Sequence, residues 1–126
     1  MNTFREDVRN GEFRIQIKAE SMLLYTVKTV SNTKYFPNWM RGSLVRIILD
    51  HATGIFDSIA AANATRDIDV RMEWQQKALQ GCAQMLGLID MCERDGLIKM
   101  DKALKWSRLV MDVRYMTTAW ARITTK

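Results

Sequence analysis

Apolar residues recur every three or four positions along four stretches of the chain, which is the spacing of helices with one buried face. These stretches cover residues 12–31, 39–63, 68–94 and 101–123. Breaks fall at the loop around Pro37, at the polar run 63–67 and at Gly96. The pattern predicts one all-α domain over residues 1–126, in which residues 1–11 form a short N-terminal extension.

Short connections between long helices favour an antiparallel up-down-up-down four-helix bundle, in which the last helix lies beside the first. In the last helix we expect a core stripe of Trp106, Val110, Val113, Thr117 and Trp120. In the second helix we expect a stripe of Met40, Leu44, Ile47, His51, Ile55 and Ile59.

Charge is divided unevenly along this basic chain, whose net charge is +5. Residues 14–46 hold six basic residues and one acidic residue, whereas residues 47–98 hold four basic residues and eight acidic ones. Residues 99–126 again hold seven basic residues against two acidic ones. Because the first and last helices are expected to be neighbours, one side of the bundle should be positive.

The first two helices carry more apolar surface than one bundle needs. Phe13, Ile17 and Leu24 form a second line on the first helix, and Leu49 and Phe56 flank the stripe of the second. A broad core contact explains these residues, and so does a subunit interface. We hypothesise a homo-oligomer that uses them.

No motif for catalysis or for binding a metal or cofactor is found. His51, the only histidine, lacks the Glu-x-x-His and His-x-x-x-His spacings of helical metal sites. Cys82 and Cys92 lie ten residues apart in one expected helix, so their backbones should be ~15 Å apart, too far for a disulfide. Two free, buried thiols fit a reducing compartment, and we expect a cytoplasmic protein without enzymatic activity, metal or cofactor.

Two expected outer faces alternate basic and tyrosine side chains. One reads Arg108, Met111, Tyr115, Thr118, Arg122, and the other Arg14, Lys18, Ser21, Tyr25, Lys28. Basic groups neutralise phosphates, and a tyrosine ring can stack on an unpaired base. We therefore predict nucleic-acid binding, with an acidic protein partner as the alternative.

Two segments resemble the accessory variability determinant family of diversity-generating retroelements. The first is Phe36-Pro37 followed by Arg41 and Leu44, and the second is Arg114-Tyr115-Met116 followed by Trp120. The resemblance implies a four-helix protomer of a ring-shaped pentamer that binds a reverse transcriptase and its template RNA. Such a protein supports mutagenic copying without catalysing it. The four-helix proteins encoded in 23S rRNA intervening sequences are the near alternative.

The predicted function is thus a non-enzymatic accessory protein that binds RNA or DNA and a retroelement reverse transcriptase. A helical adaptor that holds an acidic protein is the alternative function. The predicted nucleic-acid contacts are Arg14, Lys18, Tyr25, Lys28, Arg41, Arg108, Arg114, Tyr115 and Arg122. Of these, the family motif supports only the structural equivalence of Arg41 and Arg114, either of which could instead pair with an acid at a helix junction.

Overall fold

The computed structural model describes the backbone of residues 3–124 and the side chains of residues 14–124. Within those residues the chain forms four α-helices, one 3-10 turn and no strand, which confirms the all-α class. The elements are α1 (Thr3–Ser31), η1 (Asn38–Met40), α2 (Leu44–Ala64), α3 (Ile68–Arg94) and α4 (Met100–Thr124). None of these helices has the length and apolar character that crossing a lipid bilayer requires.

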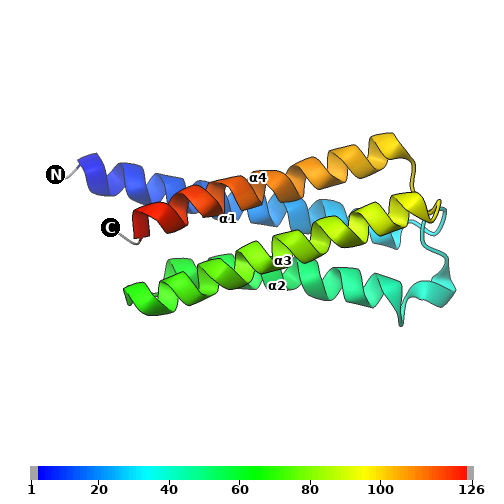
Figure 1. Ribbon diagram of the computed structural model, residues 1–126, viewed down its shortest axis with the longest axis horizontal. Helices are drawn as coiled ribbons and strands as arrows, with labels where there is room; N and C mark the ends of the chain where they lie inside the picture. The colour runs from blue at the N-terminus through cyan, green and yellow to red at the C-terminus, as the bar shows by residue number, and fades with distance from the viewer. Residues whose placement is uncertain (1–2, 125–126) are drawn as a thin grey trace.

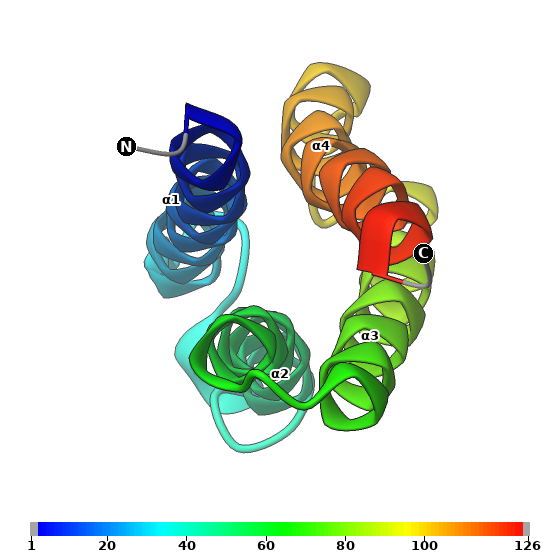
Figure 2. The ribbon, with the colours of Figure 1, turned by 90° about the vertical axis from the view of Figure 1, so that its left-hand side faces the viewer.

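Each helix packs against its neighbours in the sequence, and α4 returns to pack against α1. Viewed end-on, the four helices stand at the corners of a square, with α1 opposite α3 and α2 opposite α4 (Figure 2). The chain reverses its direction at every connection, so α1 begins and α4 ends at the same end of the bundle (Figure 1). This arrangement brings the basic first and last helices side by side.

Two of the expected helix boundaries are wrong. α1 begins at Thr3, so residues 3–11 belong to the helix rather than to an extension, and Gly11 lies inside it. A single helical glycine costs only about 1 kcal/mol relative to alanine, which the rest of a long helix tolerates. At the second helix, residues 38–40 form the separate turn η1, and α2 starts at Leu44.

The expected core stripe of α4 is confirmed, because all five of its residues are buried. The stripe expected for α2 is confirmed at Ile55 and Ile59, which are buried, but it is wrong at Ile47, which is exposed, and at His51, which is only half-buried. The buried line of α2 instead runs through Val45, Ile48, Ala52, Ile55 and Ile59. Since α2 is apolar over about half of its circumference, helical periodicity alone allows two neighbouring stripes. Because α2 packs against both α1 and α3, the stripe that contains Val45, Ile48 and Ala52 is the one that is buried.

Two glycines shape the packing of α3. A Cβ on Gly81 would lie 2.8 Å from Ile55 Cγ1, so the glycine permits α2 and α3 to approach closely. Gly96 follows the helix with a φ of +78°, the left-handed conformation that closes many helices. Leu97 N–H donates to Cys92 O and Gly96 N–H donates to Glu93 O, each at 3.0 Å, so these two carbonyls near the end of α3 are satisfied.

Arg71 holds three elements together at the end of the bundle where α2 passes into α3. Its Nε donates to Ala62 O at 3.0 Å and its Nη2 donates to Thr65 O at 2.7 Å. These acceptors lie at the C-terminal end of α2, where helical carbonyls lack partners within the helix. The guanidinium also lies 5.6 Å from the centroid of the Trp120 ring on α4.

Candidate nucleic-acid interface

The surface where α1 meets α4 is rich in basic side chains, and we call it the α1/α4 seam. Contacts define it: Lys18 on α1 pairs with Asp112 on α4 at 3.7 Å, and Lys102 and Lys105 of α4 lie over the ring of Tyr25 on α1. On each of the two helices, residues three or four positions away from these contacts lie on the same side and extend the seam along the helix. The basic members of the seam are Arg14, Lys18, Lys28, Lys102, Lys105 and Arg108. Its acidic members are Asp101 and Asp112, so six positive charges face two negative ones.

Two lysines share one aromatic ring in the seam. Lys102 Nζ and Lys105 Nζ lie 4.8 Å and 5.6 Å from the centroid of Tyr25, and Lys102 Nζ lies 5.4 Å from that of Tyr35. Within residues 14–124 neither lysine forms an ion pair with a carboxylate. The rings hold the ammonium groups by cation–π attraction but leave their charge uncompensated. An incoming phosphate would supply the missing negative charge.

Tyr25, predicted as a stacking residue, is less accessible than its expected place on an outer face implies. Tyr25 is half-buried, its ring is covered by the two lysines, and its hydroxyl is buried without a hydrogen-bond partner among the described atoms. The reason is that Tyr25 faces α4 rather than solvent. Lys102 and Lys105 were missed, although the basic composition of residues 99–126 already pointed to this helix.

The outer face of α4 carries the other expected tyrosine. Tyr115 is 79% exposed, in agreement with its expected place on an outer face. A shallow groove of about 380 Å³ lies beside it and is lined by Met111, Arg114, Tyr115, Thr118, Ala119 and Arg122. Arg108 is not among the lining residues, since the groove begins at Met111, about one turn further along α4. Arg114 lies toward α3, where its charge lowers the pKa of Cys82 against the larger effect of burial.

The expected basic surface is therefore divided between two regions of the protein. Arg14, Lys18, Lys28 and Arg108 are exposed along the seam. Arg114 and Arg122 are exposed on the outer face of α4, and Arg41 is exposed where η1 ends. Beside Arg41 lies Trp39, which is 75% exposed and which the sequence interpretation did not single out.

The residues expected at a subunit interface differ in their exposure to solvent. Ile17 and Leu24 are 45% and 53% exposed on α1. Leu49 and Phe56 are half-buried and pack against the core, so they offer less free surface than expected. The side chain of Phe13 lies outside the described residues. The apolar line that remains available is on α1.

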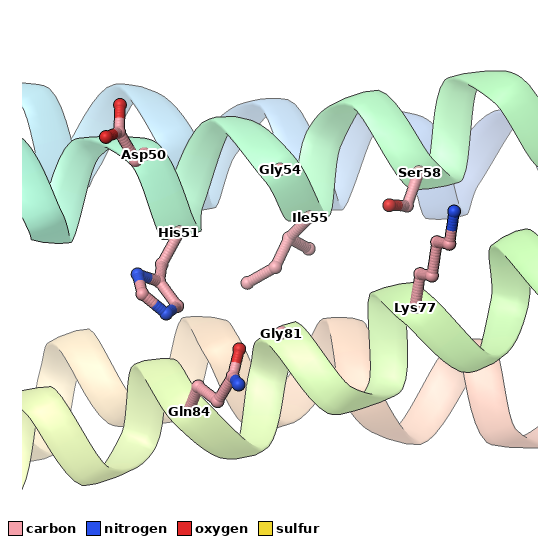
Figure 3. Close-up of a pocket in the computed structure, with 8 residues that line it drawn as sticks. All are labelled: Asp50, His51, Gly54, Ile55, Ser58, Lys77, Gly81 and Gln84. Atoms are coloured by element: carbon pink, nitrogen blue, oxygen red, sulfur yellow. The ribbon is translucent and has the colours of Figure 1, made fainter.

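A groove of about 240 Å³ between α2 and α3 contains His51, and Figure 3 shows this side chain and Gln84 directed into the space between the helices. His51 Nδ1 lies 2.9 Å from Ile47 O, a carbonyl that can only accept, so Nδ1 carries the proton. Ser58 also lines the groove, but it lies seven residues further along α2, or ~10 Å along the helix. That separation provides no direct base–nucleophile contact.

The two thiols are buried as expected. Burial raises the pKa of Cys82 to about 12 and that of Cys92 to about 11, and for Cys92 the nearby charge of Asp95 adds to the effect. Both thiols are therefore protonated near neutral pH, and a protonated thiol is a poor nucleophile. Among the described residues, no group of three histidine, cysteine or acidic side chains is placed to hold a metal ion.

The fold has a counterpart among solved structures. A protein of unknown function from the S23 ribosomal protein family of Bacteroides thetaiotaomicron VPI-5482 superposes with a TM-score of 0.76. The match covers 89% of this chain and 98% of that chain, at 14% sequence identity. The likeness is one of fold. No family model and no curated protein matches the sequence, and membership of the accessory variability determinant family stays a prediction.

Proposed function

We propose that this chain is a non-enzymatic accessory protein that binds nucleic acid along the α1/α4 seam and acts together with a retroelement reverse transcriptase. The observation that carries the proposal is the pair Lys102 and Lys105, which lies in a strongly basic seam without carboxylate partners among the described residues. The resemblance of the segments around Pro37 and Arg114 to the accessory variability determinant family supports the choice of partner.

The seam has the dimensions of a nucleic-acid track. Arg14 and Lys28 are 14 residues apart on α1, which corresponds to ~21 Å of helix. One strand of B-DNA carries a phosphate about every 3.4 Å of helix axis, so roughly six phosphates fit along this length. Contacts of lysine and arginine with phosphates carry no sequence information, so binding through the seam should be largely independent of sequence.

For the polymerase we propose the outer face of α4. Leu104, Met111 and Tyr115 are exposed there, and Arg114 and Arg122 are exposed on the same face. Exposed apolar and aromatic side chains interspersed with arginine are typical of protein interfaces. This assignment separates the partner surface from the seam.

For self-association we propose the apolar line of α1. Ile17, Leu24 and Val27 are exposed at spacings of seven and three residues, so they lie along one side of the helix. A contiguous apolar line on the surface favours contact with another protein surface. A ring of protomers, as the family resemblance implies, would repeat this contact around its axis.

The decisive experiment measures binding of the purified chain to labelled RNA and duplex DNA over a salt series. The Lys28→Glu/Lys105→Glu variant replaces two positive charges of the seam. Its matched control is Arg46→Glu/Arg66→Glu, which changes the net charge equally at exposed residues of α2 and the α2–α3 connection. In the described part of the chain α2 does not touch α4, so this control leaves the seam unchanged.

We expect salt-sensitive binding by the wild type, loss of most affinity in the seam variant, and near wild-type affinity in the control. Equal decreases in both variants would indicate a general effect of net charge and would contradict a defined track. Absence of RNA and DNA binding at low salt would contradict the proposed function and favour an acidic protein as the partner of the seam.

A further inference from the structure

We infer that Trp39 is a base-stacking site that gives the protein a preference for single-stranded over duplex nucleic acid. The inference rests on the proposed function, because stacking adds to an affinity that the seam provides. It assigns a role to the most exposed tryptophan of the described residues, at the end of the bundle that holds η1.

Trp39 projects outward from a short, hydrogen-bonded turn. Met40 N–H donates to Pro37 O at 2.9 Å and Arg41 N–H donates to Asn38 O at 3.2 Å, and these bonds close η1 around the tryptophan. Phe36, three residues earlier, is 2% exposed and anchors the segment in the core. The indole is thus presented on a hydrogen-bonded and anchored backbone, and such preorganisation lowers the entropic cost of binding a ligand.

The exposure of Trp39 differs from that of the other tryptophans. Trp106 and Trp120 are buried and Trp74 is half-buried, whereas Trp39 is 75% exposed. Moving the large apolar surface of an indole out of water is favourable, and an exposed indole does not gain this free energy. A planar ligand that covers the ring would recover it, and the face of a nucleobase is such a ligand.

The charge of the chain segment that contains Trp39 favours nucleic acid over an acidic protein partner. Between Glu20 and Asp50 the chain contains four basic residues and no acidic one. Two of the four, Lys34 and Arg41, are exposed in the segment that contains Trp39. Lys34 precedes and Arg41 follows Trp39 in this segment, and basic side chains of this kind attract the phosphates that adjoin a stacked base.

This site is also connected to the seam. Tyr35 lies four residues before Trp39, and Lys102 of the seam lies 5.4 Å from the centroid of its ring. A strand bound along the seam can therefore continue over the segment 34–41. The internal bases of a duplex are stacked on one another, so a single strand offers Trp39 many more base faces than a duplex does.

The test compares two probes, a single-stranded RNA and the duplex of the same sequence. The variants are Trp39→Ala and, as a matched control, Trp39→Phe, which keeps an aromatic ring. Because Trp39 is exposed, both substitutions should leave the circular dichroism spectrum and the melting temperature unchanged. Quenching of tryptophan fluorescence by the single strand provides a second readout, since Trp39 is the most exposed tryptophan of the described residues.

For Trp39→Ala we expect single-strand affinity to fall roughly tenfold, duplex affinity to stay unchanged and most of the quenching to disappear. Trp39→Phe should retain most of the single-strand affinity. Equal single-strand affinities of wild type and Trp39→Ala would overturn the stacking site and leave the seam proposal intact. A wild type that binds neither probe would instead contradict the proposed function. If Trp39→Ala lowered only the affinity for the polymerase, Trp39 would be a protein contact and the inference would be wrong.

Discussion

The indole Nε1–H of Trp106 on α4 donates a buried hydrogen bond of 2.9 Å to Thr26 Oγ1 on α1. The threonine hydroxyl in turn donates to Met22 O at 2.8 Å, so both polar side chains are satisfied inside the core. Both residues are fully buried, which makes their bond stronger than a solvent-exposed one. This contact fixes the register of α1 against α4 beneath the seam.

Replacement of Thr26 by valine should destabilise the bundle. The substitution keeps the shape of the side chain but leaves the indole N–H of Trp106 buried without an acceptor, at a cost of about 1–3 kcal/mol. Urea denaturation of Thr26→Val measures this destabilisation. Thr29→Val is the matched control, because the buried Thr29 hydroxyl has no hydrogen-bond partner among the described atoms. We expect the control to be neutral or stabilising; a destabilisation equal to that of Thr26→Val would disprove the role of the bond.

The close approach of α2 and α3 predicts opposite outcomes at two glycines of α3. Gly81→Ala places a methyl group 2.8 Å from Ile55 Cγ1 in the core, and we expect a destabilisation of about 1–3 kcal/mol from overpacking. Gly87→Ala meets no atom within 4 Å and should stabilise the helix by roughly 0.5–1 kcal/mol. Thermal unfolding of the two variants is the measurement, and a stable Gly81→Ala would show that the helices can separate at little cost.

Stability should fall in alkali because of the two buried thiols. Their pKa values in the folded protein are about 12 and about 11, above those of exposed cysteines in the unfolded chain. The unfolded state therefore releases these protons first. The contribution to stability is fully present below the unfolded pKa and is lost as pH rises toward 11 to 12.

The check is a series of urea denaturations from neutral pH to the alkaline limit of folding. Cys82→Ala/Cys92→Ala should show a smaller decrease with pH than the wild type, whatever its absolute stability. Parallel iodoacetamide labelling should find both thiols unreactive in the folded wild type at neutral pH. Fast labelling under folded conditions would contradict their burial.

The salt dependence of RNA binding should distinguish the two basic regions. Removing one phosphate-binding side chain reduces the slope of log affinity against log salt by about 0.7 for a single strand. Lys28→Glu/Lys105→Glu in the seam should therefore lower the slope by about 1.4. Arg114→Glu/Arg122→Glu on the outer face of α4 should change it less, and the reverse order would move the nucleic-acid track to that face.

Association between protomers is predicted to depend on α1. Leu24→Glu introduces a charge into the line of Ile17, Leu24 and Val27, and burial of an unpaired charge in an interface is unfavourable. We expect the mass in solution, measured by light scattering, to fall from an oligomer to 14.6 kDa. Ile47→Glu on α2 is the control, since Ile47 is also exposed. A wild type that is already monomeric at micromolar concentration would disprove this contact.

The sequence predicts helices most accurately where one face is apolar and the other is polar. α4 meets this condition, and its stripe from Trp106 to Trp120 is confirmed residue by residue. α2 does not, because apolar residues cover half of its circumference, and the expected stripe through Ile47 and His51 is displaced. The sequence pattern locates the buried face of a helix only when polar residues border the apolar stripe on both sides.

The candidate site was less predictable because it depends on contacts between distant segments. Lys102 acquires its place from two tyrosines, Tyr25 on α1 and Tyr35 in the loop that follows it. The sequence pattern of α4 alone does not predict these contacts, because they involve residues of other segments. The exposure of Trp39 likewise depends on the anchoring of Phe36 in the core, since a tryptophan in an apolar segment is more often buried.

The direction of the chain has a practical consequence for work with this protein. α1 begins and α4 ends at one end of the bundle, and η1 lies at the other (Figure 1). α4 contains 25 residues, so a group attached after it is displaced ~37 Å along the bundle from the start of that helix. A fluorophore or surface tether placed there leaves the region around Trp39 open to solution. The protein can thus be immobilised through the end of the bundle where α4 ends, while the opposite end, which holds η1, stays accessible to ligand.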